Sequence, residues 1–207
     1  VYGHSYYVMT KNIQNAHESL LKRFVKECLL EVAKSPRNMP MGLSIIISDV
    51  SKDEFTVHFP EDCPIFGFVT AQKATTGSAG GPCNNAFEVI ASSASQGWGP
   101  LLYDIAIEWA SKKGSGLMSD RTSVSDYAYN VWKFYNDYRP DIESDQLDNP
   151  RNHLTVVKSD NCSQKSAMHH DGENWKSSPI SKRYSKKGTP LIDEMISAGQ
   201  LSIKSGQ

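Results

Sequence analysis

The sequence lacks the patterns that mark several classes of protein. Its four cysteines, spread over 207 residues, form no C-x-x-C pair, which argues against a zinc ribbon or a thioredoxin-type redox motif. No apolar run approaches the roughly 20 residues that span a bilayer, and the first residues lack the basic and then apolar pattern of a signal peptide. Neither sign of charge dominates, since the formal net charge is -1, so we do not expect nucleic acid as a partner. We therefore expect a cytoplasmic protein that makes no membrane contact.

The length and the distribution of apolar residues indicate one globular domain. A chain of 207 residues can bury a substantial core. Its apolar segments gather in residues 1–140, whereas residues 141–207 are polar apart from a few anchors and a short apolar piece near the end. We expect the second segment to be an irregular extension that wraps the same domain and ends in one short helix.

The first 140 residues alternate between helix and strand patterns. Apolar residues at helical spacing predict an amphipathic helix over residues 12–36. Proline in the first turn and Gly114 after the last predict a second helix over residues 100–113, and a third is expected over residues 123–140. Strands are predicted for residues 42–50, 53–60, 64–74, 86–91 and 116–121. This order predicts an α+β fold, a mixed α/β sandwich.

A glycine-rich loop separates the fourth strand from the second helix. The stretch "SQGWGP" places two glycines and a tryptophan directly before the helix. The first turn of a helix carries free backbone N–H groups and the positive end of the helix dipole, so glycines there let a phosphate approach the backbone. Trp98 either covers such a ligand or packs beneath the sheet, and the sequence leaves both readings open.

Strand, glycine loop, helix, strand and helix follow one another in the register of a known family. Residues 89–135 resemble the acyl-CoA-binding half of the GNAT superfamily, whose members transfer an acyl group from coenzyme A to an amine. Val89 lies eight residues before Gly97, and Gly97-Trp98-Gly99 supplies the G-x-G of the family's loop. The resemblance implies a mostly antiparallel central sheet flanked by helices. It also implies acetyl-CoA as cosubstrate and no metal.

The resemblance further implies which residues hold coenzyme A. The diphosphate would accept hydrogen bonds from the loop amides, and the pantetheine arm would pair with the edge of the preceding strand as an added strand does. The implied cofactor-binding residues are Val89, Ile90, Ala91, Gln96, Gly97, Trp98, Gly99 and Pro100.

Direct acyl transfer also needs a base for the amine and an acid for the thiolate. Glu88 is the candidate base and Tyr135 the candidate acid. Either residue has a structural alternative: a solvent-facing strand position for Glu88, a core aromatic for Tyr135.

Two departures from the family pattern bear on catalysis. Ala94 stands where the family's loop has Arg or Gln, and the family's tyrosine register in the last helix falls on Trp132. The function therefore has alternatives. The chain is an N-acyltransferase for an amine of a small molecule or a protein, a catalytically inactive GNAT-like binding protein, or a structural protein associated with nucleic acid or another protein. The acceptor amine and the oligomeric state are not readable from the sequence.

Three other groups attract attention in the polar segment. His169, His170 and Asp171 could bind a metal, although adjacent histidines without a third spaced ligand are more often solvated. Cys162 could be a nucleophile with His153 or His169 as its base. The basic run "SKRYSKKG" could touch nucleic-acid phosphate, although a solvated loop is the simpler interpretation.

Overall fold

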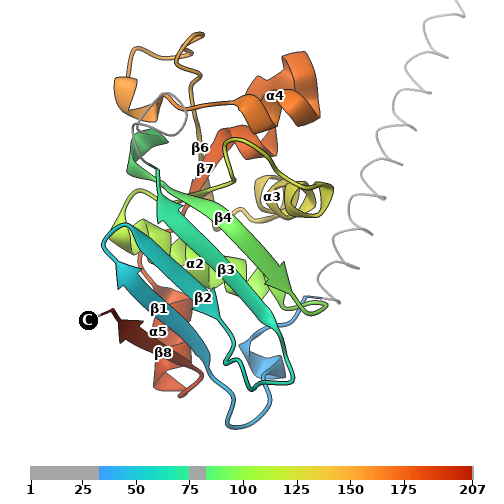
Figure 1. The fold of residues 1–207 in the computed structure, drawn as a ribbon, viewed down its shortest axis with the longest axis vertical. Coiled ribbons are helices and arrows are strands. Elements are labelled where there is room, and N and C mark those ends of the chain that lie inside the picture. The colour runs from blue at the N-terminus through green and yellow to red at the C-terminus, as the bar shows by residue number, and fades with distance from the viewer. Residues whose placement is uncertain (1–32, 75–82, 207) are drawn as a thin grey trace, which may run out of the picture. The chain divides into compact units, whose positions relative to one another are not determined.

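The structure is a computed structural model that describes residues 33–74 and 83–206. The described residues from 34 onward form one compact unit. Most of the helix predicted for residues 12–36 lies outside the described residues. The fold is α+β, as predicted, with a mixed sheet and helices against it (Figure 1).

Eight strands in the order β6-β7-β5-β4-β3-β2-β1-β8 make the sheet of the described residues. Only β4–β5 and β1–β8 pair in parallel, so the sheet is mostly antiparallel, as expected. The strands are β1 (Ile45–Ser51), β2 (Glu54–His58), β3 (Gly67–Lys73), β4 (Phe87–Ala94), β5 (Leu117–Met118), β6 (Glu143–Gln146), β7 (Lys182–Ser185) and β8 (Leu201–Ser205).

The helices are α2 (Gly99–Lys113), α3 (Asp126–Tyr138), α4 (Lys165–Asp171) and α5 (Pro190–Ser197). In the part of the chain that the structure describes, five short 3₁₀ helices connect the larger elements: η1 (Pro36–Asn38), η2 (Cys83–Asn85), η3 (Lys158–Asp160), η4 (Gly172–Ser177) and η5 (Pro179–Ser181). The helices predicted after the glycine loop and before Pro140 correspond to α2 and α3.

The central strands show the alternation of apolar and polar residues that is typical of a sheet with one buried face. In β2, Phe55 and Val57 are buried on the face that α2 covers, while Thr56 and His58 lie half-buried on the opposite face. Gly67 at the start of β3 lies so close to the helix that an added Cβ would approach Leu102 Cδ1 to 2.7 Å. The tight packing of α2 on this part of the sheet therefore depends on a glycine.

Helix α2 is buried on more than one side. We expected an apolar stripe facing the sheet, yet nine of its residues are buried, among them Tyr103 and Glu108. The sheet, including β7, covers part of its surface, and α5 packs on another part. Tyr135 of α3 and Arg139 at its end bond to Asp104 of α2. A helix that is apolar around most of its circumference belongs in the interior.

Residues 141–207 contribute regular structure as well as irregular chain. The expected irregular path holds for residues 147–164 apart from η3, but β6, β7 and β8 are three of the eight strands of the sheet. Ionic contacts allow this polar sequence to pack. Both carboxylate oxygens of buried Glu108 accept N–H groups of Leu191 and Ile192 at the start of α5, and Lys186 Nζ lies 3.2 Å from Glu108 Oε1.

Candidate functional site

Strand β4 is paired on both sides only at its beginning. It pairs with β3 from Phe87 to Ala94, but with β5 only at Phe87↔Leu117 and Glu88↔Met118. From Val89 onward β4 and β5 part, and residues 91–94 are exposed. This stretch of β4 leaves an unpaired strand edge in the interior of the sheet.

A bulge marks the point where the two strands part. The register against β3 shifts between Ala71↔Val89 and Thr70↔Ala91, so Ile90 is the extra residue. A bulge re-aims the chain and ends regular pairing. Ile90 is 45% exposed, although its side chain is large and apolar.

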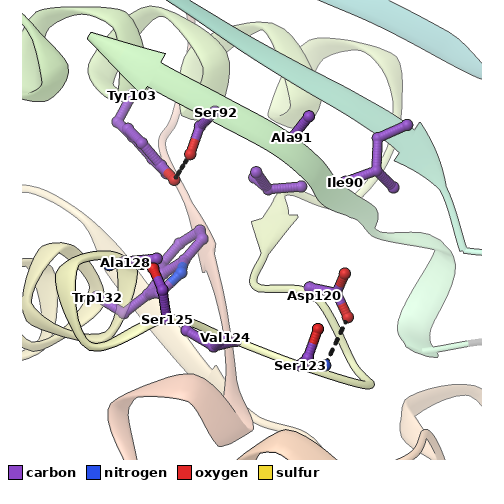
Figure 2. A pocket seen from close by; sticks show the side chains of 11 residues that line it. Ile90, Ala91, Ser92, Tyr103, Asp120, Ser123, Val124, Ser125, Ala128 and Trp132 are labelled. Atoms are coloured by element: carbon purple, nitrogen blue, oxygen red, sulfur yellow. Dashed lines mark hydrogen bonds between the residues drawn. The ribbon is translucent and has the colours of Figure 1, made fainter. Parts of the chain in front are cut away.

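A cavity of about 210 Å³ lies where β4 leaves β5. It is bounded by β4, by Tyr103 of α2, by the turn after β5 and by the first turn of α3 (Figure 2). Its lining residues are Val89, Ile90, Ala91, Ser92, Tyr103, Asp120, Ser123, Val124, Ser125, Ala128 and Trp132. Three of the residues predicted to bind a cofactor, Val89, Ile90 and Ala91, therefore share one cavity wall.

A hydroxyl pair stands in this cavity. The Oη of Tyr103 and the Oγ of Ser92 lie 3.0 Å apart (Figure 2). Burial raises the pKa of Tyr103, against a lowering by the Ser92 hydrogen bond, so the phenol stays protonated at neutral pH. The Tyr103 ring packs edge-on against Trp132, with centroids 5.5 Å apart, which fixes its position.

The glycine loop brings backbone amides to the start of α2. Gly97 has φ 86°, which favours glycine, and its carbonyl accepts the Lys34 N–H. The Trp98 N–H is bonded to the Ser95 carbonyl, and Pro100 has no N–H. Within the described residues no acceptor is present for the amides of Gln96, Gly97, Gly99 and Leu101. These four donors precede or begin a helix, where an anion is favoured.

Trp98 packs beneath the sheet, which decides between the two readings that the sequence left open. Only 6% of its surface is exposed, and its ring meets Phe59 edge-on at 5.3 Å. Its side chain therefore anchors the glycine loop to the core.

Glu88 lies at the closed end of the parting strands. Its Oε1 accepts the backbone N–H of Arg121 at 2.6 Å. Burial is the largest influence and raises its pKa, which the Arg121 hydrogen bond opposes and the nearby charge of Asp120 reinforces. Asp120 lines the cavity, and Val89, next to Glu88, does too. Glu88 itself is not among the residues that line the cavity. Its carboxylate lies next to the lining and has a raised pKa, and both features favour a role as a base.

Tyr135 is not among the residues that line the cavity. It is 2% exposed, and its hydroxyl donates to Asp104 Oδ1 at 2.7 Å, with the Pro100 carbonyl at 3.2 Å. Arg139 Nη1 binds the same Asp104 oxygen at 2.6 Å. Burial first, and then the Asp104 charge, raise the pKa of Tyr135 well above its usual value. Tyr135 therefore belongs to a hydrogen-bonded network that joins α2 and α3.

The other candidates from the polar segment have structural partners. His170 stacks on Tyr129 with ring centroids 4.9 Å apart, and the Tyr129 hydroxyl donates to Asp171 Oδ1 at 2.9 Å. Burial and Asp171 raise the pKa of Tyr129 to about 12. Residues 33–74 and 83–206 contain no group of three His, Cys, Asp or Glu side chains placed to hold a metal ion.

Cys162 and the basic run are also part of the packing. Cys162 is fully buried beside Cys83, whereas His153 is exposed. The basic run forms β7 rather than a solvated loop, with Tyr184 fully buried. Three of its cations form ion pairs: Arg183 with Asp145, Lys186 with Glu108 and Asp141, and Lys187 with Glu143.

Sequence reasoning missed Tyr103, Ser92 and the Asp120–Ser125 turn. Tyr103 follows Gly99 by four residues and so lies one turn further along the same helix face, which is the one signal that the sequence offered. The turn reaches the cavity only because β5 ends after Met118, and that length is set by distant pairing.

Comparison with protein-family models, with curated proteins and with solved structures found no match. In the described part of the chain, no helix has the length and apolar character needed to cross a membrane.

Proposed function

We propose that this chain is a GNAT-like N-acyltransferase that uses an acyl-CoA, of which acetyl-CoA is the simplest, to acylate an amine. The observation that carries the proposal is the unpaired edge of β4, which borders a cavity and leads directly to a glycine loop and a helix N-terminus. The resemblance in residues 89–135 supports the same assignment.

The open edge of β4 suits an extended amide chain. Unpaired N–H and C=O groups from Val89 onward can bond a ligand that lies along the strand, as in strand addition. The pantetheine arm contains two such amides. The cavity of about 210 Å³ is small for a whole cofactor, so the cofactor would lie along the edge with its thioester in the cavity.

The free amides of Gln96, Gly97, Gly99 and Leu101 suit the diphosphate. No arginine is needed for this contact, because backbone donors and the α2 dipole already favour an anion. Gln96 is exposed in the loop and can add a side-chain donor where Ala94 offers none.

Glu88 and Tyr103 are the groups that we assign to proton transfer. Glu88 takes the proton from the attacking amine, the amine nitrogen bonds to the acyl carbon, and the thiolate departs. Tyr103, whose hydroxyl stands in the cavity beside Ser92, protonates the departing sulfur. Tyr103 replaces Tyr135 in this role because the Tyr135 hydroxyl is bonded to Asp104 outside the cavity.

One observation favours binding without turnover. Trp132 lines the cavity at the register where the family has tyrosine, and an indole N–H cannot serve as an acid at accessible pH. The second candidate function is therefore a protein that binds coenzyme A without acyl transfer.

Calorimetry with coenzyme A and acetyl-CoA tests binding, and release of free thiol with a panel of amines tests turnover. Gly99→Glu should abolish binding by bulk and charge. It should still fold, since a Cβ at Gly99 meets only Ala94 Cβ at 3.9 Å. Ser202→Glu adds the same charge on exposed β8 and should bind as the wild type does. Equal affinity in Gly99→Glu would remove the loop from the site, and binding without thiol release would favour the second candidate.

A further inference from the structure

Three buried oxygens without partners lie in one loop, residues 147–162, none of which lines the cavity. They are Asp148 Oδ1, Asp160 Oδ1 and Asn161 Oδ1. They make up half of the six buried side-chain nitrogen and oxygen atoms without a hydrogen-bond partner that are found in the described residues. A buried acceptor without a partner is costly, and several in one place point to a bound ion or to water.

Backbone pairing brings these residues together. Asp148 and Asn161 form a parallel β-bridge. The Asp148 N–H donates to the Asp160 carbonyl at 3.1 Å, and the Cys162 N–H donates to the Asp148 carbonyl at 2.6 Å. As bridge partners, Asp148 and Asn161 direct their side chains to the same face. Asp148 is fully buried and Asn161 is 7% exposed.

The two carboxylates share one hydroxyl. Thr155 Oγ1 lies 2.6 Å from Asp148 Oδ2 and 3.0 Å from Asp160 Oδ2. A hydroxyl carries a single proton, so it can donate to only one of these oxygens at a time. Among the described residues, neither aspartate forms an ion pair with a Lys, Arg or His side chain. Two neighbouring negative charges are thus held in a partly buried place without a cation from the protein.

We propose that the loop binds a divalent cation, Ca²⁺, through Asp148, Asp160 and Asn161. The donor set consists of carboxylate and amide oxygens, which suit a hard cation and not a thiolate-seeking metal. Ca²⁺ accepts irregular oxygen shells, whereas Mg²⁺ demands near-octahedral geometry and keeps several waters. Two carboxylates match the charge of the ion. The amide oxygen of Asn161 adds a third ligand without adding charge.

The site would connect the loop to the beginning of β4. The Cys83 N–H donates to the Asn161 carbonyl at 3.1 Å, and the Ala86 N–H donates to the Cys83 carbonyl in the turn before Phe87. A cation that fixes Asn161 therefore also fixes the chain that leads into the strand with the open edge. The cation would bind whether or not the chain transfers acyl groups.

Thermal unfolding of the whole chain, stripped of metal and then given CaCl₂ or MgCl₂, tests the proposal. Calcium at a hundredfold excess over its dissociation constant should raise the melting temperature by roughly 5 °C or more, and magnesium by less. Calorimetry should give one site per chain. Asp148→Asn should lower the calcium affinity at least tenfold. Asp62→Asn, the same change at an exposed position outside the loop, should leave the affinity unchanged.

Asn161→Ala gives a second test that does not remove a charge. In a chelator this variant should melt near the wild type, because it deletes an acceptor that has no partner there. With calcium it should lose at least half of the stabilisation. No shift and no heat with either ion in the wild type would mean that buried water satisfies these oxygens. A calcium shift that persists in both variants would place the ion elsewhere. Either result overturns the proposal.

Discussion

The two halves of β4 differ in the number of strands that pair with them. Phe87 and Val89 are buried, and the strand pairs on both sides at Phe87 and Glu88. Beyond the Ile90 bulge, residues 91–94 keep β3 but lose β5. The closed half belongs to the core, and the open half offers backbone groups and a cavity to a ligand. In this eight-residue strand, the first half therefore contributes to stability and the second half to the candidate site.

Tyr135 and Tyr103 differ in a similar way, one being enclosed and the other open to the cavity. The Tyr135 hydroxyl is enclosed by Asp104 and the Pro100 carbonyl, whereas the Tyr103 hydroxyl stands in the cavity with Ser92. Only the second can meet a ligand without breaking a contact between helices.

The largest effect expected is on catalysis, from Tyr103→Phe. If Tyr103 protonates the thiolate, this change should lower kcat by roughly 10²–10⁴ and leave acetyl-CoA affinity nearly intact. Single-turnover thiol release and calorimetry measure the two quantities separately.

Tyr135→Phe is the matched control. It should leave kcat near the wild-type value and instead lower the free energy of unfolding by about 1–3 kcal/mol, because Asp104 loses a buried donor. A large loss of kcat in Tyr135→Phe with none in Tyr103→Phe would restore the assignment made from the sequence.

The second effect concerns the closed half and its helix. Leu102 is fully buried in α2 and packs against Gly67 of β3. Leu102→Ala should lower the free energy of unfolding by about 2–5 kcal/mol, since it removes buried methyl groups and leaves a cavity. Urea unfolding measures the loss. A change below about 1 kcal/mol would mean that α2 packs less tightly than its burial indicates.

The sequence predicted the elements of the closed half better than the site. Phe55 and Val57 alternate with polar residues, and Pro100 and Gly114 frame α2, so local pattern was enough for β2 and the helix. The cavity depends on β5 stopping after Met118, which follows from where β4 and β7 pair with it. Such a non-local property leaves no periodic signal.

The polar end of the chain shows the same limit. The basic run of residues 181–188, with one embedded tyrosine, predicts a solvated loop when it is considered alone. In the structure Arg183 pairs with Asp145 on β6 while Tyr184 stacks on Trp132 of α3. These partners lie 38 and 52 residues away in the chain, so the strand could not be recognised from its own residues.

The third effect is a pH dependence at the junction of the two halves. Burial raises the pKa of Glu88 above 4.5, so the folded protein holds this proton more tightly than the unfolded chain does. The free energy of unfolding should therefore decrease as pH rises from about 4.5 through the raised pKa. If Glu88 is the base, kcat/KM should increase over that same interval.

Glu88→Gln keeps an oxygen for the Arg121 N–H but cannot titrate. It should lack both pH trends and lower kcat/KM at least tenfold at high pH. The free energy of unfolding and kcat/KM of the two proteins, each measured across this pH range, check this prediction. If kcat/KM of Glu88→Gln still rises with pH as in the wild type, the titration belongs to another group.

The smallest effect is expected where α3 meets the open half. Ser125 is the N-cap of α3, its Oγ accepts the Ala128 N–H at 3.3 Å, and it lines the cavity. Ser125→Ala should lower the free energy of unfolding by about 1 kcal/mol, because a free amide is left at the helix start. Ser125→Asp restores the acceptor, and its charge interacts favourably with the helix dipole, so its free energy of unfolding should be near that of the wild type. The same charge should lower the affinity for an anionic ligand in the cavity. Urea unfolding and acetyl-CoA calorimetry of the two variants separate the cap from the site, and equal affinity in both would show that the ligand stays away from the first turn of α3.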